Sequence, residues 1–329
     1  MEFNKKNMRL LSLLGHRGTF SKAVCDLAES GEDICVLTAD LADLTGLEHF
    51  YTDYPDRFFN IGIAEQNMIG IAAGLSRYGS CVFATTYANF LTMRPYEQIR
   101  MNLGYMQHNV KLIGTGAGLS MGMSGNSHFG LEDISLMCSI PNMTVISPAD
   151  CTEAYKCISA AAKTSGPMYI RLSGPLNQPM VYKEDYDFKI GQAVTLKEGS
   201  DIIIISTGAV AFECLKAAEL LENNHSLSTA VINMHTLKPI DENIIQSYAN
   251  RGKLIVTVEE HSVIGGLGSI TANILSSYSA HTPLYKIGLP DSFGVSGSAD
   301  FLAEYYGLKA PIIAESILSR LEDYSVKRS

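Results

Sequence analysis

The stretch FFNIGIAEQNMIGIAAGLS, residues 58–76, is almost entirely apolar, and Glu65 is its only charged residue. It begins as a loop or strand end and continues as a helix from about Glu65. The segment CVFATTY at 81–87 follows it and is typical of a buried strand. After Glu65, the apolar residues Met68, Ile69, Ala72 and Leu75 recur at the spacing of one face of a helix.

The same alternation of apolar strands and helices runs along the rest of the chain. Continuous apolar strands that alternate with helices predict parallel sheets covered on both faces. We therefore expect an α/β protein with two three-layer α/β/α domains and mostly parallel sheets. The further expected strands are 34–41, 110–116, 168–173, 201–208, 228–239, 253–261 and 283–289, and the expected helices are 20–30, 95–107, 153–164, 209–224, 242–252, 265–277 and 310–321.

A change of composition separates two series of strands and helices. The stretch GPLNQPMVYKEDYDF at 174–188 is rich in proline and polar residues and has little periodicity. Such a segment is typical of an interdomain linker. The sequence thus predicts one domain at 1–185 and a second at 186–329.

Charge and cysteine usage exclude several classes of function. The 329 residues carry 34 acidic and 25 basic side chains, a net charge of −9, which argues against nucleic acid or an anionic membrane as partner. The seven cysteines are scattered without a CxxC pair, which is typical of a reducing compartment. No apolar run is long enough to span a membrane or to form a signal peptide. We expect a cytoplasmic protein.

Glu65 has two interpretations from the residues alone. A carboxylate in the first turn of a helix is favoured by the helix dipole, which is the plainer one. Alternatively, it is buried in an apolar wall and shares a proton with a ligand nitrogen, because an unpaired buried carboxylate is costly. Downstream, Gly70 and Gly74 lie four residues apart and predict close helix packing, in particular across a subunit interface.

Three motifs give the chain a resemblance to a known family. RFFNIGIAEQNMIGIAAGLSRYG at 57–79, PNMTVISPAD at 141–150 and VEEHSVIGGLGS at 258–269 resemble the C-terminal half of transketolase. They are most similar to the short subunit of split bacterial transketolases, from about residue 15 to the end. The resemblance implies a thiamine diphosphate enzyme, of which this chain supplies the pyrimidine-binding and C-terminal domains.

The resemblance also implies a partner chain. In the family a further domain binds the diphosphate and Mg²⁺ through a GDG…N motif, and this sequence has no such motif. The Mg²⁺ is then bound mainly by an N-terminal transketolase subunit, and we expect no metal ligands in this chain. Because active sites of the family lie between subunits, an α2β2 heterotetramer is expected.

The family pattern assigns cofactor roles to four positions. The glutamate that matches Glu65 bonds the pyrimidine nitrogen N1′ and so promotes loss of the proton from the thiazolium C2. Tyr87 and Phe90 match aromatic residues of the pyrimidine pocket, where ring contacts suit a flat heterocycle. Asp40 matches an acidic residue near the thiazolium ring.

Substrate positions are only partly retained. His128 matches a histidine that points at substrate hydroxyls, and Arg17 matches an arginine near the N-terminal edge of the site. Ser124 stands where the family has an aspartate that binds a substrate hydroxyl. Gly116 replaces a histidine and Gly174 an arginine. Since a sugar phosphate needs several cations or donors, the replacements predict an atypical substrate.

The expected reaction is transfer of a two-carbon ketol unit from a ketose to an aldehyde. Three alternatives remain open from the sequence. They are the β subunit of a 2-oxo acid dehydrogenase-type enzyme, a deoxyxylulose phosphate synthase-like enzyme, and a scaffold subunit without turnover. The donor, the acceptor and the pathway are open too.

Overall fold

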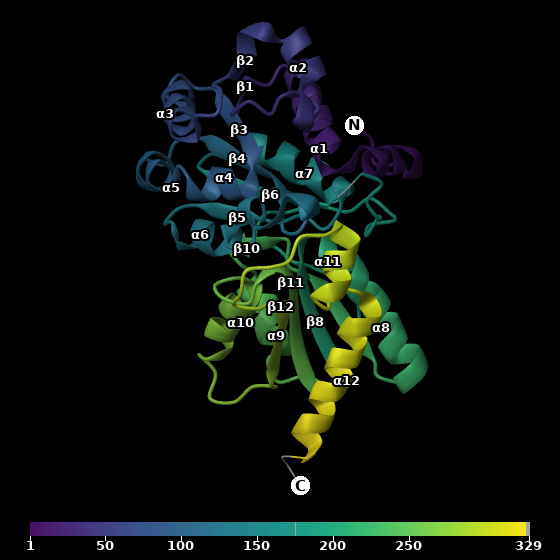
Figure 1. Ribbon diagram of the computed structural model, residues 1–329. Helices are drawn as coiled ribbons and strands as arrows, with labels where there is room; N and C mark the ends of the chain where they lie inside the picture. Colours follow the sequence, from purple (N-terminus) through teal and green to yellow (C-terminus); the bar gives the residue numbers. More distant parts are fainter. Residues whose placement is uncertain (175, 327–329) are drawn as a thin grey trace.

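The computed structural model describes residues 1–174 and 176–326 (Figure 1). Two α/β units lie one above the other in this view, the first drawn in purple to teal and the second in green to yellow. The N-terminus lies beside the first unit, and the last helix points away from it at the far end of the second.

The first sheet is parallel except at one edge. Its strand order is β10-β5-β6-β4-β3-β1-β2, and β10 runs antiparallel to β5. The helices α1 and α7 cover one face and α3 and α6 the other. The strands are β1 Ile34–Thr38, β2 Phe58–Asn60, β3 Cys81–Tyr87, β4 Val110–Ala117, β5 Thr144–Ile146, β6 Met168–Ser173 and β10 Thr236–Lys238. The helices are α1 Lys5–Glu29, α2 Glu48–Asp53, α3 Glu65–Ser76, α4 Ala88–Met93, α5 Tyr96–Gln98, α6 Asp133–Ser139 and α7 Cys151–Ala162.

The second sheet has the strand order β12-β11-β8-β9-β7, and only β7 is antiparallel to its neighbour. Side chains of α8 and α12 pack on one face, and those of α9 and α10 on the other. The strands are β7 Val194–Lys197, β8 Ile202–Thr207, β9 Thr229–Asn233, β11 Leu254–Ser262 and β12 Leu284–Leu289. The helices are α8 Ala211–His225, α9 Glu242–Tyr248, α10 Leu267–Leu275, α11 Ala299–Tyr305 and α12 Ala310–Val326.

The predicted fold class is confirmed, because both sheets are mostly parallel and lie between helix layers. The strand predicted at 228–239 is wrong in one respect. It divides into β9 and β10, and β10 leaves its own domain to pair with β5 of the first sheet, Thr236 opposite Ile146. The domain boundary at residue 185 therefore stays a prediction. Strand β10 follows residue 185 in the sequence but belongs to the sheet of the first domain.

The linker predicted at 174–188 is held firmly by a buried carboxylate. Glu153, in the first turn of α7, accepts hydrogen bonds from the hydroxyls of Tyr182 at 2.8 Å and Tyr186 at 2.7 Å. It also accepts from Asn233 Nδ2 of the second domain at 2.9 Å. These bonds join both domains and the linker at one point.

A second buried polar group, which we call the interdomain seam, comprises Asp133, Arg171, Glu260 and His261. Arg171 Nε donates to Asp133 Oδ2 at 2.8 Å, and Arg171 Nη2 donates to the Glu260 carbonyl at 2.8 Å. Arg171 is 1% exposed and Asp133 fully buried. The Asp133–Arg171 ion pair lies within the first domain, and removing one partner of such a buried pair costs about 3–5 kcal/mol. The hydrogen bond from Arg171 to the Glu260 carbonyl links this pair to the second domain.

All seven cysteines are free thiols. Among the described residues, no helix is both long and apolar enough to cross a membrane.

Candidate active site

The residues predicted to bind a cofactor or substrate come from one edge of the first sheet. Asp40 follows β1, Tyr87 ends β3, and His128 lies in the loop after β4. Glu65 begins α3, which follows β2. The carboxyl ends of parallel strands meet at the same edge of a sheet, and ligands of α/β proteins bind there.

Glu65 is buried at the start of α3, where only 5% of the residue is exposed. The sequence predicted that this carboxylate would have no partner within the chain. The structure shows otherwise, because Arg94 Nη1 donates a hydrogen bond to Glu65 Oε1 at 2.6 Å. Arg94 comes just after α4, and 44% of its side chain is exposed. The sequence offered no signal for this pair, since the two residues are 29 positions apart and belong to different segments of the fold.

Three aromatic rings lie next to this ion pair, and we call Tyr87, Phe90 and His128 the ring cluster. The centroid of His128 is 5.9 Å from that of Tyr87 and 5.2 Å from that of Phe90. The Tyr87 and Phe90 centroids are 5.8 Å apart. The guanidinium of Arg94 lies 3.7 Å from the Phe90 centroid, so this one cation contacts both Glu65 and the ring cluster.

Arg17 also lies near Tyr87. Its guanidinium carbon is 5.8 Å from the Tyr87 centroid, and Nη2 lies 3.4 Å from Met121 Sδ. A break in α1 places it there, because Gly15 has φ 66° and ψ 178°, values outside the helical range. The structure thus brings Arg17, Glu65, Tyr87, Phe90 and His128 into one continuous set of contacts.

Asp40 lines a neighbouring cavity of about 680 Å³ together with Leu44 and Phe58. Its backbone has φ 61°, which is rare for a non-glycine residue and costs on the order of 1 kcal/mol. Asn60, a residue that the sequence analysis missed, stabilises it. Asn60 Nδ2 donates to Asp40 Oδ1, and Asn60 Oδ1 accepts from the Asp40 N–H, both at 3.1 Å.

Gly116 and Gly174, which replace a histidine and an arginine of the family pattern, lie close to the side chains of other residues. A Cβ atom on Gly116 would lie 2.9 Å from Met121 Sδ, and one on Gly174 would lie 2.2 Å from Gln178 Nε2. Gln178 Nε2 in turn donates a hydrogen bond to the Ser173 carbonyl at 3.1 Å. An arginine at 174 therefore does not fit unless Gln178 moves. Ser124 is exposed on the loop before His128.

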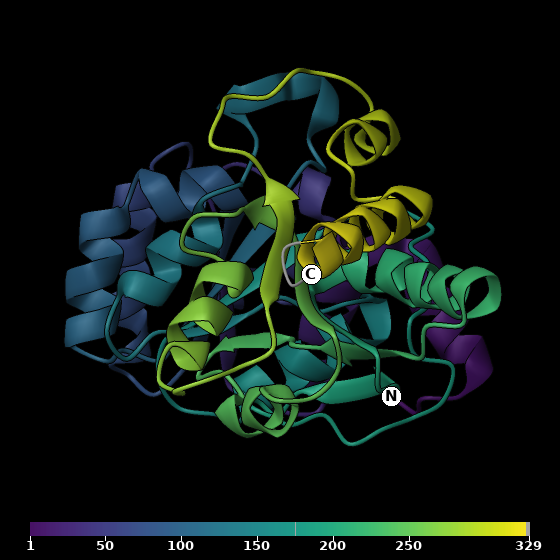
Figure 2. The same cartoon turned by 90° about the horizontal axis from the view of Figure 1, so that it is seen from below.

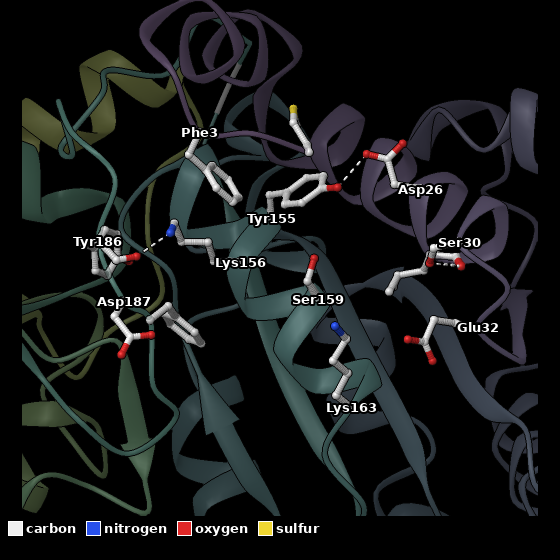
Figure 3. Close-up of a pocket in the computed structure, with 13 residues that line it drawn as sticks. Phe3, Asp26, Ser30, Glu32, Tyr155, Lys156, Ser159, Lys163, Tyr186 and Asp187 are labelled. Atoms are coloured by element: carbon white, nitrogen blue, oxygen red, sulfur yellow. Dashed lines mark hydrogen bonds between the residues drawn. The ribbon is translucent and has the colours of Figure 1, made fainter.

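A different cavity, of about 410 Å³, lies between α1, α7 and the linker (Figure 3). The Lys156 ammonium lies 4.2 Å from the Phe3 centroid and 4.9 Å from the Tyr186 centroid. Tyr155 donates its hydroxyl to Asp26 at 2.6 Å. The cavity contains none of the residues that the sequence singled out as cofactor or substrate ligands.

No group of three or more histidine, cysteine, aspartate or glutamate side chains that could hold a metal ion occurs in residues 1–174 and 176–326. The site described above consists of the ion pair between buried Glu65 and partly exposed Arg94, three rings, a second arginine and a strained aspartate. A flat, polar group, the Arg94 guanidinium, lies against both Glu65 and Phe90.

Comparison with known proteins shows the family of both domains. The model of the transketolase pyrimidine binding domain matches residues 14–178, and that of the transketolase C-terminal domain matches residues 191–313. A protein of Methanocaldococcus jannaschii, provisionally described as a transketolase C-terminal section, is 40% identical over 94% of this chain and 96% of its own.

Two further matches are informative. A 6-deoxy-6-sulfo-D-fructose transketolase subunit of Clostridium sp. is 36% identical over 91% of this chain and 92% of its own. The solved structure of a split-gene transketolase, an inactive β4 tetramer, superposes with a TM-score of 0.84 at 39% identity. It covers 93% of this chain and 98% of the other.

Proposed function

Because the chain belongs to the transketolase family, we propose that it is the C-terminal subunit of a split enzyme that moves a two-carbon ketol unit from a ketose to an aldehyde. Proteins of this family use thiamine diphosphate, which supplies the carbon nucleophile for breaking the bond next to a ketone. The observation that carries the proposal is that Glu65 and Phe90 converge on the same planar group, the guanidinium of Arg94.

The side chains present suit an aminopyrimidine ring. The Arg94 guanidinium is planar, donates a hydrogen bond to Glu65 and lies against the Phe90 ring. An aminopyrimidine is also planar and carries a ring nitrogen beside an amino group, so the same two side chains suit it once Arg94 has moved. Glu65 then holds a proton at the ring nitrogen, and its burial keeps water away from that bond.

The remaining cofactor contacts are divided between two chains. Tyr87 supplies a second aromatic wall, and Asp40, held by Asn60, supplies a carboxylate at the subunit boundary. We propose that the diphosphate and Mg²⁺ are bound mainly by an N-terminal partner subunit, because this sequence lacks the GDG…N motif that binds them in the family. We infer an α2β2 heterotetramer located in the cytoplasm.

The substrate is proposed to be an atypical ketose. His128 and Arg17 are placed at the ring cluster to bind hydroxyl groups and an anionic group, and the exposed Ser124 replaces the usual carboxylate. Gln178 and Met121 lie where side chains at positions 174 and 116 would begin, so an arginine or a histidine there would have to displace them. The Clostridium relative, whose printed substrate is a sulfonated ketose, supports the idea that such subunits serve modified sugars.

The test uses the complex of this chain with its N-terminal partner, supplied with thiamine diphosphate and Mg²⁺. We expect Glu65→Gln to lower the rate of ketol transfer by about 100-fold or more, the usual contribution of a positioned acid–base group. Xylulose 5-phosphate, fructose 6-phosphate and 6-deoxy-6-sulfofructose serve as donors, with ribose 5-phosphate as acceptor.

Glu48→Gln is the matched control, because Glu48 is an exposed carboxylate in the first turn of α2 and is expected to leave the rate unchanged. Equal rates for the Glu65→Gln and wild-type complexes would exclude the proposed role. A wild-type complex that binds the cofactor but transfers no ketol unit would instead favour a scaffold subunit.

A further inference from the structure

The loop that carries His128 is closed on itself. Gly118 and Gly130 bond each other through their backbones, Gly118 N to Gly130 O at 2.9 Å and the reverse at 3.3 Å. The residues between them form a compact surface loop with its ends together. His128 lies near its C-terminal end, where its N–H donates to the Gly125 carbonyl at 2.9 Å.

The second domain contacts this loop through a segment of its own, residues 290–298, which connects β12 to α11. Asn126 Nδ2 donates to the Gly294 carbonyl at 2.7 Å, and the Gly294 N–H donates to Asn126 Oδ1 at 2.8 Å. We call this reciprocal pair the clasp. In Figure 2 the yellow-green segment 290–298 passes over the blue-teal loop at the top of the view.

The two segments approach so closely that side chains are excluded between them. A Cβ atom on Gly122 would lie 2.4 Å from the Gly297 carbonyl oxygen, and one on Gly125 would lie 2.4 Å from Ser296 Oγ. The Gly297 N–H also donates to the Gly122 carbonyl at 3.4 Å. The contact is therefore made along the length of both segments rather than at a single bond.

The start of the loop is held by the second domain as well. Glu260 Oε1 accepts from the Leu119 N–H at 3.1 Å, and a Cβ atom on Gly118 would lie 2.3 Å from Glu260 Oε2. Glu260 belongs to the interdomain seam, so one end of the loop is tied to the buried contact between the domains. The clasp holds the other end, two residues before His128.

We propose that residues 290–298 of the second domain position the substrate-binding loop, and that Asn126 is the positioning residue that keeps His128 against Tyr87 and Phe90. This inference rests on the proposed function, in which His128 contacts a substrate hydroxyl. The second domain contributes no side chain to the ring cluster among the contacts described above. It acts instead by restricting the loop, because a misplacement of 1 Å at a binding group can cost about 100-fold in rate.

The test uses the complete complex with thiamine diphosphate and two variants that open the contact in different ways. Asn126→Ala removes both hydrogen bonds of the clasp, and Gly122→Ala inserts a methyl group against the Gly297 carbonyl. Asn7→Ala is the matched control. It deletes a single side-chain hydrogen bond, from Asn7 Nδ2 to the Glu2 carbonyl, at the start of α1.

Two readouts are combined. Amide hydrogen exchange of residues 118–130 is expected to become about fivefold faster in both variants, the factor for loss of a typical hydrogen bond, with no change in the control. The KM for the ketose donor is expected to rise about tenfold while the dissociation constant of thiamine diphosphate stays within about twofold of the wild type. A merely structural role would alter cofactor binding and thermal stability as much as KM.

Unchanged exchange in 118–130 would show that the clasp does not restrain the loop, and the inference would fall. Faster exchange with an unchanged KM in an active complex would overturn it as well, because the restrained loop would then not serve the substrate. A wild-type complex without any ketol transfer contradicts the proposed function itself, a result distinct from either of these.

Discussion

Arg94 is the single residue that changes the interpretation of the site. Glu65 was predicted to be unpaired in the chain, with its partner supplied by a ligand, and the structure instead gives it the Arg94 guanidinium at 2.6 Å. The same guanidinium lies on Phe90. On the proposed function, Arg94 holds the place of the cofactor ring in the free subunit and has to leave when the ring binds.

We therefore expect Arg94→Ala to tighten binding of thiamine diphosphate to the complex by about threefold to tenfold, because no ion pair must be broken first. In the free subunit the same change is expected to lower the free energy of unfolding by about 1–3 kcal/mol, since Glu65 loses its hydrogen-bond partner in a buried position. Fluorescence titration with the cofactor and urea denaturation measure the two effects.

Arg100→Ala is the control for Arg94→Ala, because Arg100 is an exposed arginine a few residues further along the chain. It should change neither quantity. Weaker cofactor binding in Arg94→Ala would show that Arg94 is a ligand of the cofactor complex rather than a competitor for its site.

At the scale of elements, helix α3 has a first turn and an outer face that differ in character. Its first turn presents Glu65 to the site, and its outer face presents Gly70 and Gly74, both exposed. A Cβ atom on either glycine would meet no other atom within 4 Å. The chain by itself therefore does not use these glycines for packing, and the predicted subunit contact at this face stays a prediction.

Substitutions on this face should separate folding from assembly. Gly74→Ala is expected to raise the free energy of unfolding of the isolated chain by about 0.5–1 kcal/mol, because alanine favours a helix and the space is open. Gly74→Leu is expected to leave the fold intact but weaken association with the partner chain by about tenfold, as a large side chain prevents close approach of a second helix.

Light scattering after size-exclusion chromatography measures this association. Glu219→Leu, on an exposed position of α8, controls for the addition of a surface leucine. Wild-type association of the Gly74→Leu chain would show that this face of α3 does not meet another subunit.

At the scale of the whole molecule, the interdomain seam should make stability depend on pH. His261 is fully buried there, and desolvation lowers its pKa from 6.5 to about 4, opposed in part by the nearby Asp133 carboxylate. The unfolded chain takes up the proton first as the pH falls. The stabilisation present above pH 6.5 is thus lost progressively between about pH 6.5 and pH 4.

We expect wild type to lose about 2 kcal/mol of stability relative to His261→Gln when the pH is lowered from 7 to 5, by the linkage between protonation and folding. Urea denaturation of both proteins at the two pH values measures this difference. His16, whose pKa is likewise lowered to about 4 by burial, titrates in both proteins and cancels. A stability difference that stayed the same at pH 5 and pH 7 would contradict the assignment.

Much of the fold was predictable because its signals are local. The continuous apolar strands such as 81–87 and 168–173 and the helical spacing after Glu65 depend only on neighbours a few residues away, and β3, β6 and α3 agree with them. The same local character explains the error at 228–239. The pattern showed an extended segment but not that its second half would pair with β5 of the other domain.

By itself, the sequence determined that this protein is a two-domain α/β chain of the transketolase family with a carboxylate at the start of α3. Only the tertiary structure decided which groups meet that carboxylate and the loop beside it. Arg94 reaches Glu65 across 29 residues, and Gly294 reaches Asn126 across 168. Such contacts have no periodic signature, because they depend on how separately folded segments and whole domains pack against one another.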